Sequence, residues 1–326
     1  MKKLTASLGL MAAALVSSCA STQPVNPEMA SAPKLEAFST DFNPATAPWR
    51  GGEQRFLAAC ENWDDWDKPA PPFQILGNTF HVGTCGISAI LVVSPEGHIL
   101  IDSGTEAGAK VVLDNIRALG FDPADVKYLA MSHEHHDHVG GHGAIVRATG
   151  AKLVASQAGA ETLRRGQVGP DDPQAAIHEA MEPVSVGLVL RDGETLKLGD
   201  LELTAHATPG HTPGALSWTW WACTLPGEPP VCRRVAYVDS LSPVSADGYR
   251  FDAHPAYLAD YRASIAKVAT LPCDILLTPH PSASDMITRL QHGMLDDQTA
   301  CARYSNALEK RLDTRLAEEA EGKHGG

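Results

Sequence analysis

Residues 132–141 read Ser-His-Glu-His-His-Asp-His-Val-Gly-Gly, which places four potential metal ligands within six residues. These ligands, His133, His135, Asp137 and His138, follow the spacing H-x-H-x-D-H. In a short extended or turning segment alternate side chains point to one side, so His133 and His135 can share one metal ion. The other two ligands then point toward a second position. Imidazole and carboxylate ligands together suit a borderline-soft divalent ion such as zinc.

A histidine-rich surface loop is the competing interpretation of this run. The preceding residues, 126–131, read Val-Lys-Tyr-Leu-Ala-Met, which is typical of a buried strand that ends where the motif begins. Because a buried strand delivers the ligands, the sequence favours a metal site over a surface loop.

Four ligands are too few for two tetrahedral sites, so other segments must supply the rest. Two later segments each consist of an apolar strand followed by a turn that carries a histidine. His211 lies in Thr-Pro-Gly-His-Thr-Pro-Gly at residues 208–214, and His280 lies in Thr-Pro-His-Pro at residues 278–281. His211 can complete a three-histidine site, and His280 an Asp-His-His site. Each site then keeps an open position, which indicates catalytic rather than structural zinc.

The H-x-H-x-D-H motif, the T-P-G-H-T-P-G turn and the P-H-P segment together resemble the metallo-β-lactamase superfamily of binuclear zinc hydrolases. The resemblance extends over about residues 72–311. It is strongest to the third subclass of class B β-lactamases, in which histidine replaces a cysteine ligand at the second zinc. The resemblance implies two zinc ions per chain, one held by His133, His135 and His211 and the other by Asp137, His138 and His280.

The resemblance implies an exported zinc-dependent β-lactamase that confers antibiotic resistance by hydrolysing the lactam amide of penicillins, cephalosporins and carbapenems. The expected nucleophile is a hydroxide that bridges the two zinc ions, because metal binding lowers the pKa of water toward neutrality. Asp137 is the expected catalytic residue, since it can bind the second zinc and orient the hydroxide. Asp102, at the end of a predicted strand, can support a ligand histidine or simply cap a turn.

Three residues are candidate substrate contacts. In the third subclass, two serines at the spacing of Ser240 and Ser242 help hold the substrate carboxylate. Without the resemblance, turn capping would explain both serines. Gln167 lies in a glycine-bearing loop that can overhang the cleft, and it is the third candidate.

Strand and helix patterns alternate along the chain in two halves. Strands are expected within residues 80–93, 99–101, 126–131, 152–155, 196–203 and 273–277, and helices at 107–119, 143–149, 256–271 and 299–319. This alternation predicts an α/β fold in which two β-sheets pack face to face with helices outside. It agrees with the αβ/βα sandwich that the resemblance implies, with ligands on strand-end loops where the halves meet.

Composition narrows the possible functions. The chain has 326 residues, 44% of them hydrophobic, which suits one large catalytic domain, expected at residues 49–326. Its formal net charge of −13 argues against nucleic acid as a partner, because the phosphates would be repelled. A monomer that binds a small β-lactam is expected.

The N-terminal sequence predicts export. Residues 1–19 have the basic start and short apolar stretch of a signal peptide. Val-Ser-Ser-Cys at 16–19 resembles a bacterial lipobox, in which lipid on Cys19 would attach the protein to the outer membrane. Cleavage after Ala20 is the alternative, and both routes predict a periplasmic protein. Residues 20–48 are predicted to be a flexible arm.

The cysteine count also fits export. Seven cysteines less Cys19 leave six, an even number for a compartment that permits disulfides. Three pairings are expected: Cys223 with Cys232, Cys273 with Cys301, and Cys60 with Cys85. The bond between Cys223 and Cys232 would close a small hairpin. The resemblance favours the bond between Cys273 and Cys301, and Cys60 and Cys85 are the two cysteines that remain. Zinc ligation by cysteine is the competing idea, but the chain contains no C-x-x-C.

A thioester hydrolase resembling glyoxalase II is the main rival function, because that family uses the same ligand set. It also uses a bridging aspartate, a role open to Asp239 if its side chain points inward. Export, the expected disulfides and the serines that follow Asp239 favour the lactamase.

Two further functions stay open. A lactonase for acylated signalling lactones often has a tyrosine near the site, which Tyr237 or Tyr249 would supply. A zinc-sequestering protein is the non-enzymatic alternative, and the open coordination positions argue against it.

Overall fold

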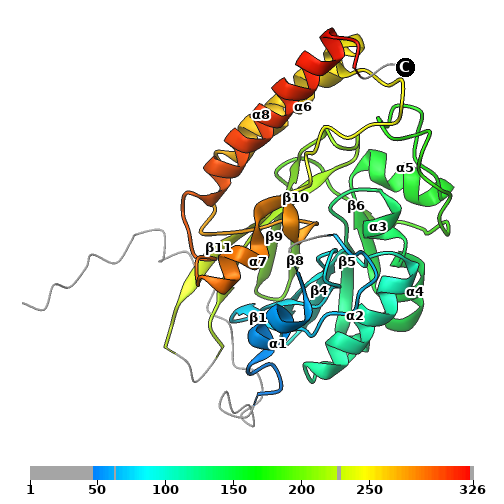
Figure 1. Cartoon of the computed structure of the whole chain (residues 1–326). Coiled ribbons are helices and arrows are strands. Elements are labelled where there is room, and N and C mark those ends of the chain that lie inside the picture. The colour runs from blue at the N-terminus through cyan, green and yellow to red at the C-terminus, as the bar shows by residue number, and fades with distance from the viewer. Residues whose placement is uncertain (1–46, 62–63, 226–228, 324–326) are drawn as a thin grey trace, which may run out of the picture. The chain divides into compact units, whose positions relative to one another are not determined.

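The computed structural model describes residues 47–61, 64–225 and 229–323, which belong to one compact unit (Figure 1). The predicted signal peptide, Cys19 and nearly all of the predicted arm at residues 20–48 lie outside the described residues. Within the described part, no helix has both the length and the hydrophobicity needed to span a bilayer.

Two β-sheets form the centre of this unit. The first sheet contains, in order, β1 (Phe73–Leu76), β2 (Thr79–His81), β3 (Ile90–Ser94), β4 (Gly97–Ile101), β5 (Val126–Ala130), β6 (Lys152–Ala155) and β7 (Leu188–Val189). The second has the order β12 (Ile275–Leu277), β11 (Cys232–Tyr237), β10 (Leu216–Cys223), β9 (Leu201–Ala207) and β8 (Thr195–Leu198). Strands β1 to β4 are antiparallel neighbours and β4 to β7 parallel ones, whereas the second sheet is antiparallel except for the pair β11 and β12.

Helices cover the outer faces of both sheets (Figure 1). They are α2 (Glu106–Ala118), α3 (His136–Val139), α4 (His142–Thr149), α5 (Gln157–Arg165), α6 (Pro255–Val268) and α8 (Ala300–Ala320). Helices α1 (Gly52–Ala59) and α7 (Met286–Gln291) instead contact side chains that lie between the sheets. Short 3-10 turns are η3 (Pro123–Asp125), η4 (Phe251–Ala253) and η5 (Pro281–Ser284). Hydroxyl caps fix two of the helix starts: Thr105 accepts a hydrogen bond from Gly108 N in α2, and Ser156 accepts one from Gly159 N in α5.

The buried side chains form layers. The inner cluster lies between the sheets and joins residues such as Ile90 and Trp218. Outer clusters join the first sheet to α2, α4 and α5, and the second sheet to α6 and α8. Side chains alternate along β3, so Val92 faces the inner cluster while Leu91 and Val93 face the helices. The predicted αβ/βα sandwich is therefore confirmed.

The two sheets are bonded directly where the histidine motif begins. Leu216 at the start of β10 donates its N–H to the carbonyl oxygen of Ser132 at 2.6 Å. The indole of Trp218, in the same strand, donates to the carbonyl oxygen of Met131 at 2.9 Å. These two bonds hold the end of β5 against the second sheet.

All three expected disulfides are present. They join Cys60 to Cys85, Cys223 to Cys232 and Cys273 to Cys301, with Cα–Cα distances of 5.2, 4.1 and 6.3 Å. The third bond ties the residues before β12 to the first turn of α8.

Candidate metal centre

A buried aspartate fixes the start of the histidine motif. Asp102 follows β4 in the left-handed region, with a φ of 63°. Its carboxylate accepts hydrogen bonds from the N–H of Ser132 at 2.6 Å, from the hydroxyl of Ser132 at 2.7 Å and from the hydroxyl of Tyr237 at 2.8 Å. Burial raises the pKa of Asp102, and the charge of His138 and these bonds offset part of the rise. Asp102 Oδ2 lies 3.8 Å from Nδ1 of His138, which is too far for a hydrogen bond. The aspartate therefore supports the motif through Ser132 and not through a ligand histidine.

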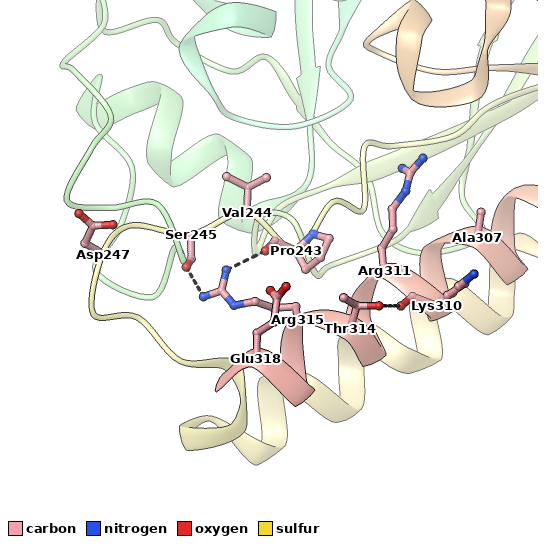
Figure 2. Close-up of a pocket in the computed structure, with 10 residues that line it drawn as sticks. All are labelled: Pro243, Val244, Ser245, Asp247, Ala307, Lys310, Arg311, Thr314, Arg315 and Glu318. Carbon is pink, nitrogen blue, oxygen red and sulfur yellow. Dashed lines mark hydrogen bonds between the residues drawn. The ribbon is translucent and has the colours of Figure 1, made fainter. Parts of the chain in front are cut away.

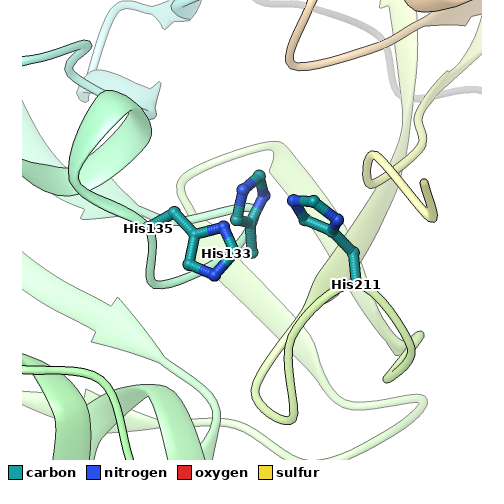
Figure 3. Close-up of side chains that lie close together, drawn as sticks. All are labelled: His133, His135 and His211. Carbon is teal, nitrogen blue, oxygen red and sulfur yellow. The ribbon is translucent and has the colours of Figure 1, made fainter. Parts of the chain in front are cut away.

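Three histidines from two segments converge on one point (Figure 3). His133 and His135 come from the loop after β5, and His211 comes from the turn between β9 and β10. Each offers a ring nitrogen, and the three nitrogens lie within 4.8 Å of one another. All three side chains are buried.

The outer nitrogen of each ring is already bonded. Nδ1 of His133 lies 2.8 Å from Oδ1 of Asp239, and Nε2 of His135 lies 3.0 Å from Oδ2 of Asp172. Nδ1 of His211 donates to the carbonyl oxygen of Ser242 at 2.9 Å. These bonds fix each ring's orientation and direct the other nitrogen toward the point that the three rings share. Nε2 of His133 is buried and has no hydrogen-bond partner among the described residues.

A second group of donor atoms lies beside the first. Oδ2 of Asp137 is 2.9 Å from Nε2 of His138 and 3.3 Å from Nε2 of His280. The two nitrogens are 3.2 Å apart, so the three atoms form a compact triangle. Donor atoms of His133, Asp137 and His138 also lie within 4.8 Å of one another, which makes the two groups neighbours.

The protonation states of the first group and of Asp137 suit metal binding, whereas at His138 burial is outweighed by the neighbouring carboxylates, Asp137 first, which raise the pKa of the ring. Burial and the neighbouring imidazoles hold the pKa values of His133 and His135 well below the ordinary value, and burial lowers the pKa of His211 to about 3. These rings are therefore neutral at pH 7, with a lone pair available. Burial opposes ionisation of Asp137, but His138 and His280 outweigh it and hold its pKa well below the usual range.

The candidate ligands are divided between the two halves of the fold. In each group, two ligands follow β5 of the first sheet. The third ligand follows a strand of the second sheet: β9 for His211 and β12 for His280. Neither half contains a complete group.

The two groups open into a cleft of about 410 Å³. Ser240 and Ser242, the serines predicted to contact the substrate, both line it. The hydroxyl oxygen of Ser240 is buried and has no hydrogen-bond partner among the described residues. It is therefore available to a ligand in the cleft.

The structure does not place Gln167 in the cleft. Helix α5 ends at Gly166, which has a φ of 69°, and the chain turns so that Gln167 is exposed to solvent. Gln174 lines the cleft instead, with its side-chain nitrogen 3.4 Å from Nε2 of His211. Gln174 therefore occupies the place in the cleft that was expected for Gln167, and a substrate contact there stays a prediction.

Two cleft features escaped the sequence interpretation. The imidazole of His178 stacks on His135 with ring centroids 3.8 Å apart, and Asp172 binds the outer nitrogen of the same ring. Asp172 lies 37 residues from His135 in the sequence. These side chains meet only because of the path that the chain takes after α5. No spacing of residues in the sequence predicts that contact.

The position of Asp239 bears on the rival function. Its carboxylate is fully buried behind His133 and binds Nδ1, the nitrogen that faces away from the cluster. Asp239 belongs to neither group of converging donor atoms found in the described part of the chain. It therefore lies behind a ligand and not between the two groups.

Comparison with known proteins places this site in a family context. A sequence model described as the Metallo-beta-lactamase superfamily matches residues 82–220. Among curated proteins, the N-acyl homoserine lactonase AttM of Agrobacterium fabrum is 29% identical over 229 residues, covering 64% of this chain and 78% of the lactonase.

Solved structures are more similar. The MIM-2 metallo-beta-lactamase is 52% identical, with a TM-score of 0.77, and the match covers 82% of this chain and 98% of that one. The beta-lactamase MIM-1 from Novosphingobium pentaromativorans is 48% identical, with a TM-score of 0.79 and coverage of 82% and 99%.

Proposed function

The chain belongs to the metallo-beta-lactamase superfamily, and from this membership we propose that it is a zinc-dependent β-lactamase that hydrolyses the lactam amide of penicillins, cephalosporins and carbapenems. The observation that carries the proposal is the pair of adjacent donor groups, His-His-His and Asp-His-His, opening into a cleft that two serines line. The nearly complete coverage of MIM-2, at 52% identity, favours a lactamase over the lactonase class.

The residues present fit two zinc ions. Imidazole nitrogen and carboxylate oxygen are ligands that zinc accepts, and three of them in each group leave an open position. The buried, unpartnered Nε2 of His133 is accounted for if it binds a metal. We propose His133, His135 and His211 as ligands of the first ion, and Asp137, His138 and His280 as ligands of the second.

When bound, the two ions polarise the lactam carbonyl and lower the pKa of water. The protein holds the reacting groups in place. Asp239, Asp172 and the carbonyl of Ser242 orient the three imidazoles of the first group. Asp137 can accept a proton or a hydrogen bond at its carboxylate, and Ser240 can donate from its unpartnered hydroxyl to the substrate carboxylate.

The cellular setting is part of the proposal. Residues 1–19 direct export to the periplasm, where the enzyme confers resistance by protecting cell-wall targets. Residues 49–326 form one catalytic domain that acts as a monomer. Attachment to the outer membrane then depends on lipid at Cys19.

The decisive experiment compares three substrates. The purified, zinc-loaded mature protein is given a carbapenem, a glutathione thioester and an N-acyl homoserine lactone, each with and without a chelator. We expect the carbapenem's absorbance to fall only when chelator is absent, with the other two substrates unchanged. Hydrolysis of the thioester or the lactone instead of the carbapenem would assign the protein to the corresponding hydrolase class.

Replacing Asp239 by asparagine tests the role of the carboxylate behind His133. We expect zinc affinity to fall about 10- to 100-fold, the usual effect of removing a carboxylate that orients a ligand histidine. Competition with a chromophoric chelator measures the affinity and the number of ions bound. Asp172→Asn is the matched comparison, since Asp172 supports His135 in the same way, and we expect a fall of similar size. Simultaneous loss of both ions in Asp239→Asn alone would instead indicate a bridging ligand.

A further inference from the structure

The cleft contains one positive side chain that the proposed metal sites do not use. Among the described residues lining it, Arg311 of α8 alone is a lysine or arginine, whereas Asp64 and Asp137 add negative charge. The chain as a whole carries a formal net charge of −13. A β-lactam with a free carboxylate is an anion, so its binding calls for a local cation.

Arg311 lies on a helix that is bound to the segment carrying the two serines. The hydroxyl of Tyr304, in α8, donates to the carbonyl oxygen of Ser240 at 3.1 Å. Arg315, one turn after Arg311, donates to the carbonyl oxygen of Pro243 at 3.1 Å and to the hydroxyl of Ser245 at 2.7 Å. Helix α8 and residues 240–245 therefore hold one another in place.

The guanidinium of Arg311 is available. Within the described part of the chain it has no hydrogen bond or ion pair, although Arg315 on the same helix is fully engaged. Figure 2 shows the Arg311 side chain extending from α8 clear of the other residues drawn, while Arg315 is bonded to Pro243 and Ser245. An exposed arginine presents a planar fork that binds a carboxylate through two parallel hydrogen bonds.

A second hollow begins at the same residue. A groove of about 670 Å³ lies between residues 243–247 and α8, and it shares Val244 and Arg311 with the cleft. Its wall includes the apolar side chains of Pro243 and Ala307 (Figure 2). Arg311 thus stands where the groove meets the cleft.

We propose that Arg311 binds the substrate carboxylate beside Ser240 and Ser242, and that the substituent on the carboxylate-bearing ring lies in the groove beyond it. This assignment rests on the proposed β-lactamase function. In cephalosporins and carbapenems that substituent is attached next to the carbon bearing the carboxylate. A carboxylate held at Arg311 therefore directs the substituent toward the groove.

The test compares two arginines of helix α8. Arg311→Ala is expected to raise KM about ten-fold for a carbapenem, the value of one charge-assisted hydrogen-bonded contact, with kcat within about two-fold. Arg303→Ala removes the same charge from a residue of α8 that lines neither the cleft nor the groove and pairs with Asp297, and KM should stay within about two-fold. Zinc content and thermal unfolding should match the wild type in both variants, and Arg311→Lys should restore part of the loss.

A neutral substrate separates carboxylate binding from a structural role. With a cephalosporin methyl ester, Arg311→Ala and the wild type should have the same KM, because there is no carboxylate to bind. Equal KM increases for acid and ester, or equal effects of the two alanine variants, would overturn the assignment. If the wild type hydrolysed no β-lactam, the proposed function would fail and the assignment of Arg311 would fail with it.

The groove is tested by filling it. Ala307→Trp should raise KM for a cephalosporin with a large substituent next to the carboxylate and leave one with hydrogen at that position unchanged. Equal changes for both substrates would overturn the placement of the substituent in the groove.

Discussion

Replacing Asp137 by asparagine is expected to lower kcat/KM for β-lactam hydrolysis by about a thousand-fold. Asp137 is the single carboxylate among the six proposed ligands, and its Oδ2 lies 2.9 and 3.3 Å from the nitrogens of His138 and His280. Asparagine keeps the shape but carries no charge and cannot accept a proton. Stopped-flow hydrolysis and metal analysis together measure the change.

Asp64→Asn is the matched control for this substitution. Asp64 lines the same cleft, but its carboxylate accepts a hydrogen bond from Ser282 and lies 3.8 Å from Nδ1 of His280, on the outer side of that ring. We expect kcat/KM to stay within about three-fold, because an exposed charge of this kind has a small effect. Comparable losses in both variants would contradict a special role for Asp137.

Removing the disulfide between Cys273 and Cys301, by alanine at both positions, is expected to lower the free energy of unfolding by about 3.6 kcal/mol. The bond closes a loop with a sequence separation of 28 residues and ties the approach to β12 to α8. Its loss frees the unfolded chain more than the folded one. Denaturant unfolding of the zinc-loaded protein gives the value.

The disulfide of the hairpin formed by β10 and β11 provides the comparison. Cys223 and Cys232 are separated by only 9 residues, so the same double replacement there should cost about 2.6 kcal/mol. The longer loop should therefore show the larger loss by about 1 kcal/mol. A reversed order would mean that loop entropy does not govern the stability that these bonds provide.

Local patterns were sufficient to predict the candidate ligands. The spacing in residues 132–141 reflects the turn from β5 into α3, and the turns around His211 and His280 follow apolar strands. The stripe Tyr304, Leu308 and Leu312 likewise predicted α8, because residues four apart share one helix face. These features depend on neighbours in the sequence.

The remaining parts of the site depend on tertiary contacts. Gln174, rather than Gln167, enters the cleft because Asp172 turns the backbone by accepting a hydrogen bond from the N–H of Gln174 at 2.7 Å. Asp239 approaches His133 across 106 residues. Arg311 lies on the exposed face of an amphipathic helix, where a charged side chain is ordinary. Its position at the cleft follows only from the packing of α8 against residues 240–245.

Because the ligands are divided between the two sheets, metal binding should also stabilise the folded protein. Each ion is proposed to join a loop after β5 to a turn at the end of a strand in the opposite sheet. Separation of the sheets therefore requires release of both ions, and binding free energy adds to folding stability. Free zinc at about a hundred times its dissociation constant would contribute about 2.7 kcal/mol per site. In a zinc-poor environment the protein would then lose its activity and also be degraded faster. The reason is that the metal-free form unfolds more often and exposes its chain to proteases.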